Sequence, residues 1–356
     1  MRKIYLIRHA KPAFPNDERY CLGITDMPLG TFGRLQAILM AENEKLRSLN
    51  AVYSSTLSRA EETAAFLGRN VTVCKGLEEM YAGEWDGLSF SQIKKQYADV
   101  YAARGVDITF PIPGSENIRD GEKRFETALM NIAETSTGDI AVVAHKTVIQ
   151  SLLAVLYGFP PEMHRQFELP YCSYSLLEYD GQFHAKEYGI LEKPQLDTEL
   201  CLKLLRGAGA DARLEAHCKK VAEKALEIAD ELSRAGTELD RELINSSSLL
   251  HDIARAEADH AARGAKWLAE LGYEAQAGIV RQHHDIDAFA INEAAVVHIA
   301  DKCVSGSTIV PIEERFSKSK AKCSSPQAIE AHRKRHDSAI WIKDKINEIC
   351  GSEVII

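Results

Sequence analysis

Arginine and histidine follow an apolar segment at the start of this chain, and both residue types can act on phosphate groups. Residues 4–7 are apolar and predict a buried strand, which ends in Arg8 and His9 before a proline-containing turn. In open α/β sheets, ligands bind at the carboxyl ends of the strands. A guanidinium can bind a phosphate through two parallel hydrogen bonds, and an imidazole can act as a nucleophile or a base. We therefore expect a phosphate site here; a surface Arg-His pair at a strand end is the alternative.

Three later segments carry residues of similar chemistry. Arg59 is expected in the first turn of a helix that follows a strand end and a turn. Glu79 lies four residues before a loop rich in glycine and tryptophan, residues 83–87. A second apolar strand ends in His145, and a helix over residues 147–157 follows it directly. An anion near His145 would therefore meet the free N–H groups and the positive dipole end of that helix.

In this order and spacing, residues 1–190 resemble the histidine phosphatase (phosphoglycerate mutase-like) superfamily. The resemblance implies an α/β three-layer sandwich. It also implies that His9 is the phosphorylated nucleophile and that Glu79 is the general acid. The residues that would line the phosphate pocket are Arg8, Arg59 and His145.

Residues 23–29 match the loop that lies on the substrate side of this family's pocket, and Thr25 of this loop is expected to contact the substrate. Two positions depart from the family pattern. The glycine that usually follows the catalytic histidine is Ala10, and the glycine that follows the second histidine is Lys146. Neither change removes a catalytic group. Lys146 could add positive charge near the phosphate or narrow the pocket, which leaves the substrate preference open.

The chemistry of a phosphomonoester explains these residue types. Its transition state spreads negative charge over the equatorial oxygens, and two guanidinium groups stabilise that charge without losing their protons. A neutral imidazole of His9 attacks phosphorus, and Glu79 must be protonated to donate to the leaving alkoxide. This reaction needs no metal. The alternatives are that Arg59 pairs with Glu61 or Glu62 on a helix surface and that Glu79 is a solvated loop charge.

Length and composition bound the answer further. A chain of 356 residues is long enough for two domains. A net charge of −9 without a basic tract argues against nucleic acid as a partner. The apolar runs are too short to cross a membrane, and the N-terminus predicts a strand rather than a signal peptide. Eight scattered cysteines with no Cys-x-x-Cys pair indicate reduced thiols and a cytoplasmic protein.

The periodicity of the chain changes near residue 190. Before this point β-rich and helical segments alternate, and they end in a hairpin over residues 174–188. After a linker at residues 190–197, helical spacing dominates. The helices that we expect there cover residues 215–234, 261–271, 292–304 and 328–349. We therefore expect a histidine phosphatase domain over residues 1–192 and an all-α domain over residues 198–356.

The helical half carries residues that can bind a transition metal. His251 and Asp252 stand together at the end of an apolar helix segment. Asp301 lies in an otherwise apolar stretch, where an acidic side chain is costly unless it is paired or binds a metal. Imidazole and carboxylate ligands without thiolates suit Mn, Fe, Co, Ni or Zn rather than Ca or Mg. For any single histidine, packing in the core or solvation at the surface is the alternative.

Residues 200–310 resemble the HD-domain metal-dependent phosphohydrolases. The ligands that this resemblance implies for one ion are His217, His251, Asp252 and Asp301. The additional histidines are similar to those of a subgroup with two ions, in which Asp252 would bridge to a second ion held by His260 and His283. Whether His283 or His284 is that ligand stays open, with His283 favoured.

The two resemblances together imply a bifunctional phosphohydrolase. The first domain would hydrolyse phosphomonoesters through phosphohistidine, and its loop at residues 83–87 resembles the branch that contains alpha-ribazole phosphatase. The second would use one or two divalent transition-metal ions to hydrolyse a nucleotide-like phosphate ester or anhydride. We expect small phosphorylated metabolites or nucleotides as partners, and neither nucleic acid nor a membrane; the oligomeric state stays open. A regulatory protein that senses a metabolite, with one or both sites degenerate, is the alternative.

Overall fold

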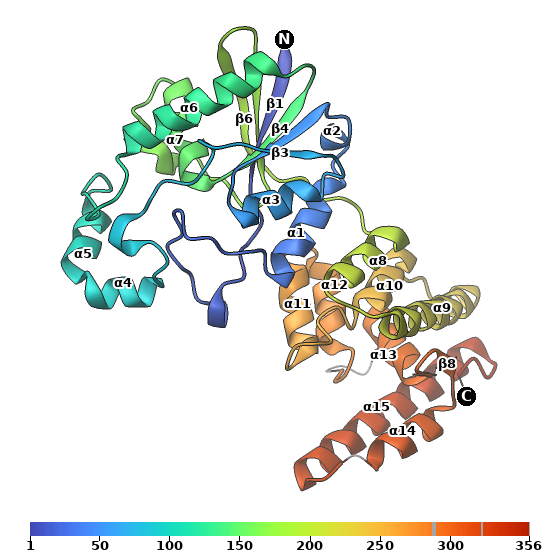
Figure 1. Ribbon diagram of the computed structural model, residues 1–356. Helices are drawn as coiled ribbons and strands as arrows, with labels where there is room; N and C mark the ends of the chain where they lie inside the picture. The colour runs from blue at the N-terminus through green and yellow to red at the C-terminus, as the bar shows by residue number, and fades with distance from the viewer. Residues whose placement is uncertain (287–289, 322, 356) are drawn as a thin grey trace. The chain divides into compact units, whose positions relative to one another are not determined.

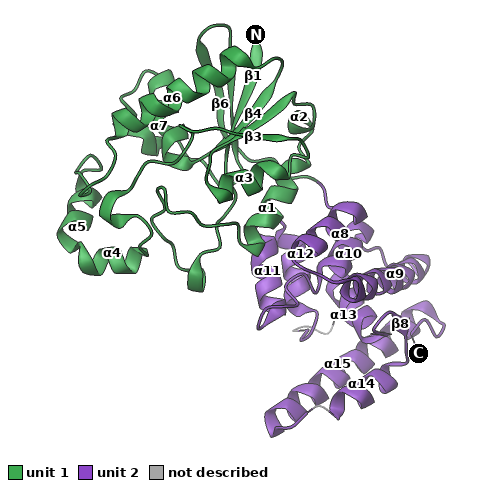
Figure 2. Cartoon of the chain, in the orientation of Figure 1, with its two compact units in different colours: residues 1–194 green, residues 195–356 purple. Residues whose placement is uncertain are grey.

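The computed structural model describes residues 1–286, 290–321 and 323–355 (Figure 1). The chain divides into two compact units, Met1–Pro194 and Gln195–Ile356 (Figure 2). Among the described residues, no helix combines the length and the apolar character that a membrane crossing requires. All eight cysteines are free thiols in the part of the chain that the structure describes.

Unit 1 is built around a six-stranded sheet with the order β3-β2-β4-β1-β5-β6 (Figure 1). The strands are β1 (Arg2–Arg8), β2 (Ala51–Ser54), β3 (Val71–Val73), β4 (Ile140–Ala144), β5 (Tyr174–Tyr179) and β6 (Phe183–Ile190). Strands β3, β2, β4 and β1 are parallel, whereas β5 and β6 form an antiparallel hairpin at one edge. The hairpin that was predicted from residues 174–188 is therefore confirmed.

Helices cover both faces of this sheet: α1 (Thr31–Ala41), α2 (Glu44–Arg47) and α3 (Ser58–Ala65) on one face, and α6 (Ile118–Thr135) and α7 (Lys146–Leu156) on the other. Helices α4 (Phe90–Gln96) and α5 (Ala98–Val106) lie away from the sheet (Figure 1). Unit 1 also contains the short 3₁₀ helices η1 (Pro15–Asp17), η2 (Gly83–Trp85) and η3 (Pro161–Gln166). Side chains alternate along a strand, so Ile4 and Leu6 pack with α6 and α7, whereas Tyr5 and Ile7 pack with α1, α2 and α3. This confirms the predicted three-layer α/β sandwich.

The strand register brings the two predicted histidines together. Strands β1 and β4 are parallel neighbours, with Arg8 opposite Ala144. His9 follows the first of these strands and His145 follows the second, so both lie at the same carboxyl edge of the sheet. The backbone N–H of His9 donates to the carbonyl oxygen of Ala144 over 3.0 Å, which extends the ladder by one residue.

Unit 2 is helical. Its helices are α8 (Thr198–Gly207), α9 (Ala212–Arg234), α10 (Arg241–Leu250), α11 (His260–Glu270), α12 (Glu274–Gln282), α13 (Glu293–Lys302), α14 (Ile312–Lys320) and α15 (Pro326–Cys350). The four helices predicted from periodicity are confirmed as α9, α11, α13 and α15, each with ends within about one turn of the predicted ones. A hairpin of β7 (Val304–Ser305) and β8 (Thr308–Ile309) was not predicted, because two-residue strands are too short to show alternation.

Helix α13 lies at the centre of unit 2. Its residues from Ala294 to Lys302 are all buried, and it packs against α9, α10, α12 and α15. Valine, isoleucine and alanine of α13 belong to one apolar core with residues of α9 and α15. Asp301 therefore reaches the site from the most deeply buried helix of this unit, which fixes the position of its carboxylate.

Two candidate active sites

The first candidate site is centred on His9 and His145, whose ring centroids lie 5.0 Å apart. Nδ1 of His9 donates to the carbonyl oxygen of Ala10 over 2.7 Å, so the lone pair of the imidazole is on Nε2. Burial, together with the positive charges of Arg59 and Arg8, holds the pKa of His9 well below its ordinary value. The ring is therefore neutral at physiological pH, as a nucleophile must be.

His145 is completely buried beside it. Its Nε2 lies 2.8 Å from Oγ of Ser55, while its Nδ1 is buried and has no hydrogen-bond partner within the described ranges. Burial lowers the pKa of His145 well below its ordinary value, and the charge of Arg59 acts in the same direction. A buried ring nitrogen without a partner is costly in the free protein and is available to a bound ligand.

The two arginines predicted for the phosphate pocket are held by main-chain carbonyls. Arg8 donates to the carbonyl oxygen of Leu169 over 2.6 Å, and its guanidinium carbon lies 3.7 Å from the ring centroid of Tyr171. Arg59 donates to the carbonyl oxygens of Gly23 and Thr25 over 2.7 Å and 2.9 Å. The Nε–H of each arginine is buried and unpartnered among the residues that the structure describes. Both are donors that an anion could satisfy.

The loop with Thr25, the predicted substrate contact, is held by two side chains. Arg59 binds its carbonyl oxygens, and Asp86 accepts the backbone N–H groups of Gly23, Ile24 and Thr25 over 3.0, 2.8 and 3.2 Å. A Cβ atom on Gly23 would lie only 2.5 Å from the carbonyl oxygen of Met80, so only glycine fits there. The sequence did not single out Asp86, although it lies in the glycine- and tryptophan-rich loop.

Glu79, the predicted general acid, is buried at the N-terminus of α7. Its Oε2 accepts the backbone N–H of Thr147 over 2.9 Å, and its Oε1 accepts that of Val148 over 3.2 Å. The expectation that the first N–H groups of this helix are free for an anion is wrong for these two, because Glu79 occupies them. Lys146 precedes them and is exposed.

The second candidate site lies in unit 2, where α9, α10 and α13 bring the predicted ligands of one ion together. Oδ1 of Asp301 lies 3.3 Å from Nε2 of His217 and 3.8 Å from Nε2 of His251. Nδ1 of His217 bonds to the carbonyl oxygen of Gly306 over 2.8 Å, and Nδ1 of His251 to that of Ser248 over 2.7 Å. These backbone acceptors orient each ring with Nε2 toward the carboxylates, as in histidines that bind metals.

Asp252 lies between this group and a second one. Its Oδ2 is 3.6 Å from Nε2 of His251, while its Oδ1 is 3.1 Å from Nε2 of His260 and 3.7 Å from Nε2 of His283. Nε2 of His284 is 2.8 Å from Nε2 of His260. The ligand atoms of His260, His283 and His284 all lie within 4.8 Å of one another. The six predicted ligands therefore converge, and His284 joins them.

The polar atoms at the centre of this cluster fit a cation. Among the described residues, Nε2 of His251 and Nε2 of His283 are buried without a hydrogen-bond partner, and Oδ1 of Asp252 is buried with Nε2 of His260 3.1 Å away. Burial lowers the pKa of His283 to about 2 and that of His284 to about 3, so both rings keep a lone pair at neutral pH. Burial alone would raise the pKa of Asp252, but His260 and His251 hold it below its usual range. Neutral imidazoles and ionised carboxylates are the ligands that transition metals need.

Lys302 is a polar contact of this site that the sequence did not reveal. Its buried ammonium lies 2.7 Å from Oδ2 of Asp301 and 3.2 Å from the carbonyl oxygen of His283. That carbonyl oxygen also accepts from Nδ1 of His298 over 3.0 Å. Lys302 thus leaves Oδ1 of Asp301 facing the histidines, and it joins the main chain of one ligand group to the carboxylate of the other.

Comparison with known families finds two matches in this chain. Residues 4–188 match the model of the histidine phosphatase superfamily (branch 1), and the chain belongs to this family. Residues 214–306 match the HD domain. The protein is therefore a phosphoric ester hydrolase in which a histidine phosphatase domain precedes an HD domain.

Individual relatives match about half of this chain. Over 163 residues the chain is 28% identical to the protein named "Putative phosphoserine phosphatase 2" of Hydrogenobacter thermophilus. The aligned region covers 44% of this chain and 80% of that protein. It is 26% identical over 169 residues to fructose-2,6-bisphosphatase of Saccharomyces cerevisiae, which covers 47% of this chain and 37% of that protein. The crystal structure of alpha-ribazole phosphatase from Shigella flexneri matches with a TM-score of 0.47 and 24% identity, over 53% of this chain and 96% of that one.

Proposed function

We propose that the protein is a bifunctional phosphohydrolase with two independent sites. The observation that carries the first activity is the neutral His9, with its lone pair on Nε2, beside His145 and the two unpartnered Nε–H groups of Arg8 and Arg59. Nε2 attacks phosphorus and the ester bond breaks. The guanidinium groups neutralise the phosphoryl oxygens, and Glu79 gives a proton to the leaving oxygen. Water then releases inorganic phosphate and restores His9.

The substrate of this site is a small phosphorylated metabolite. Although Lys146 is exposed, partial desolvation of its ammonium group lowers its pKa, and the positive charges of Arg8, Arg19 and Arg165 act in the same direction, so several cations lie near Lys146. This favours a substrate with negative charge beyond that of its ester phosphate. An alpha-ribazole phosphate is the named candidate that the loop at residues 83–87 suggests.

A direct test of the first activity is to trap the covalent intermediate. The full chain is mixed with a phosphomonoester, quenched in alkali, in which phosphohistidine survives, and analysed by peptide mass spectrometry. We expect a phosphoryl group on the peptide that contains His9, and none in the His9→Asn variant. Turnover without phosphorylation of His9 would refute the mechanism.

For unit 2 we propose one or two divalent transition-metal ions. His217, His251, Asp252 and Asp301 would hold the first, and Asp252, His260 and His283 the second, with His284 as a further ligand. When bound, such ions polarise a phosphate and supply a hydroxide at neutral pH. The role of the protein is to orient His217, His251 and His283 through their Nδ1 contacts with main-chain carbonyl oxygens and to keep His283 and His284 neutral by burial. Asp252 is placed between the two groups of ligands. The substrate class is a nucleotide-like phosphate ester or anhydride.

The two activities can act in sequence. Cleavage of a diester or anhydride at the HD site yields a phosphomonoester, which is the substrate class of the His9 site. The test is to give the full chain a nucleotide diester or polyphosphate and to follow inorganic phosphate. We expect the monoester to accumulate in His9→Ala and the starting compound to persist in Asp252→Ala. If no product of the HD site is dephosphorylated, the sequential idea is wrong.

The free thiols of all eight cysteines support the cytoplasm as the place of both reactions.

A further inference from the structure

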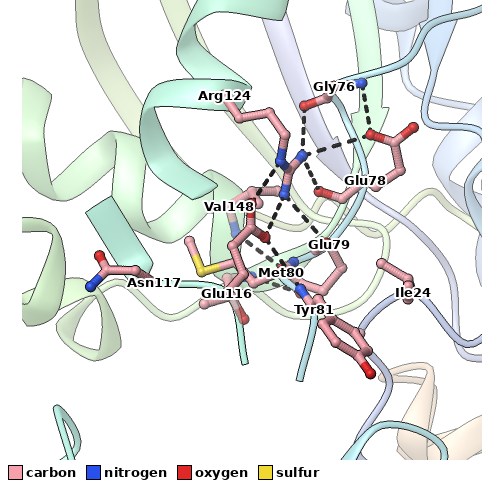
Figure 3. Close-up of polar contacts among 12 residues, drawn as sticks. Ile24, Gly76, Glu78, Glu79, Met80, Tyr81, Glu116, Asn117, Arg124 and Val148 are labelled. Atoms are coloured by element: carbon pink, nitrogen blue, oxygen red, sulfur yellow. Dashed lines mark hydrogen bonds and ion pairs between the residues drawn. The ribbon is translucent and has the colours of Figure 1, made fainter. Parts of the chain in front are cut away.

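The guanidinium of Arg124, on helix α6, binds the main chain of the segment that carries Glu79 (Figure 3). Its Nη1 donates to the carbonyl oxygens of Gly76 and Glu78 over 2.9 Å and 3.1 Å. Its Nη2 lies 3.4 Å from the carbonyl oxygen of Glu79 itself. One side chain therefore holds three carbonyl groups within four consecutive residues.

Glu116 closes the arrangement from the other side. Its carboxylate accepts from Nε and Nη2 of Arg124, both over 2.9 Å, in the bidentate geometry that only arginine offers. The same carboxylate accepts the backbone N–H of Tyr81 over 3.2 Å, and the N–H of Glu116 donates to the carbonyl oxygen of Tyr81 over 2.9 Å. Figure 3 shows these contacts on both sides of Glu79.

The main chain of residues 76–81 is thus held by Arg124 of α6 and by Glu116, whereas the carboxyl group of Glu79 is bound to α7 through Thr147 and Val148. The side chain between these two attachments has little freedom. Its position is close to His145, because Thr147 and Val148 follow that residue at the start of α7. Any shift of this segment would move the carboxyl group away from the leaving oxygen.

We propose that Arg124 is a positioning residue for Glu79: it touches no substrate, and it aligns the carboxyl group with the leaving oxygen by holding the backbone of residues 76–79. This inference rests on the proposed role of Glu79 as general acid. A displacement of about 1 Å at a reacting group can cost about 100-fold in rate, so a residue in this place can matter as much as the acid itself.

The test compares two substrates in the full chain: p-nitrophenyl phosphate, whose leaving group needs little protonation, and an alkyl phosphate, whose leaving group needs it. In Arg124→Met we expect kcat/KM for the alkyl phosphate to fall at least about tenfold more than for p-nitrophenyl phosphate. Glu79→Gln should show the same selectivity, and adding Arg124→Met to it should not increase that selectivity. Arg124→Lys keeps the positive charge but lacks the bidentate N–H donors of the guanidinium group, and it should recover part of the activity.

Arg119→Met is the matched control, because Arg119 lies on the same helix and, among the residues that the structure describes, its guanidinium pairs with Glu162 at the surface, where its side chain is 65% exposed. This variant should leave kcat/KM unchanged for both substrates. If Arg124→Met unfolds, Glu116→Gln removes one anchor of Arg124 and should show the same selectivity to a smaller extent. The proposal would be overturned if Glu79→Gln is selective but the Arg124 and Glu116 variants lose the same factor in kcat/KM for both substrates. If Glu79→Gln is itself not selective, the acid role fails and the positioning role fails with it.

Discussion

Oε2 of Glu79 lies 2.9 Å from the backbone nitrogen of Thr147, the second residue of α7. His145 is the N-cap residue of that same helix. The proposed acid and one residue of the proposed phosphate pocket are therefore attached to a single helix. The first N–H groups of a helix have no acceptor within the helix, so Glu79 also stabilises the start of α7 by accepting those of Thr147 and Val148.

Glu79→Ala should destabilise unit 1 by about 1–3 kcal/mol, because the buried N–H groups of Thr147 and Val148 lose their acceptor. Glu79→Gln keeps one acceptor oxygen and should cost less. Urea unfolding of the full chain, followed through the transition of this unit, measures the difference. Equal stability of Glu79→Ala and the wild type would show that the contact is not formed in solution.

The loop clamped by Arg59 and Asp86 gives a second prediction. Gly23→Ala places a Cβ atom 2.5 Å from the carbonyl oxygen of Met80 and 2.7 Å from the nitrogen of Ala82, and neither backbone atom can move cheaply. We expect a loss of about 1–3 kcal/mol in stability and a lower kcat/KM for phosphomonoesters, since Arg59 loses its fixed partner. Gly105→Ala, where no atom lies within 4 Å of the added carbon, is the control. Unchanged activity in Gly23→Ala would argue against the clamp.

The cluster of candidate metal ligands in unit 2 gives a third prediction. Asp252→Ala removes the carboxylate that faces both ligand groups and should abolish binding of both ions. His284→Ala should weaken only the second ion. Metal content per purified chain, measured by mass spectrometry, and the thermal stability of unit 2 report this without any assay of activity. His184→Ala, at an exposed histidine of unit 1, should retain all metal. Full metal content in Asp252→Ala would refute the shared-carboxylate assignment.

The buried histidines of unit 1 predict a dependence of stability on pH. Burial is the main cause that lowers the folded-state pKa of His9 and His145 below the ordinary value of 6.5, and the charges of nearby arginines lower it further. The unfolded chain therefore binds more protons than the folded one between these pKa values. The resulting stability is complete above about pH 6.5 and is lost as the pH falls toward the folded-state pKa.

Urea unfolding at about pH 7.5 and pH 5.5, on either side of the ordinary histidine pKa, measures this loss. His9→Asn should lose less stability than the wild type over the same interval, since one of the two groups no longer titrates. Identical losses in both proteins would mean that His9 is not held neutral by its surroundings.

The parts of both sites that the sequence predicted share one property: a polar residue interrupts an apolar pattern. His9 and His145 end apolar strands, and Asp301 lies in an apolar helix, so each is visible from its neighbours in sequence. The architecture followed from the same patterns, because strand alternation and helical periodicity are local.

Other contacts could not be predicted, because their partners are main-chain atoms far away in the sequence. Arg124 binds carbonyl groups near residue 78, and no pattern around it differs from that of an ordinary exposed helix. Lys302 reads as the charged end of a helix, but it binds the carbonyl oxygen of His283. His283 and His284 are adjacent and chemically identical, so only their positions in the fold could show that both face the cluster.

The most direct test of the central claim, that two independent phosphohydrolase sites share this chain, is one matrix of rates. Hydrolysis of p-nitrophenyl phosphate and of a nucleotide diester is measured for the full-length wild type, His9→Ala and Asp252→Ala, each with and without EDTA. We predict that the monoesterase resists EDTA and falls by about three orders of magnitude or more only in His9→Ala. The diesterase should disappear with EDTA or with Asp252→Ala and persist in His9→Ala. If one substitution removes both activities, or if neither site turns over its substrate, the account of two independent enzymes is contradicted.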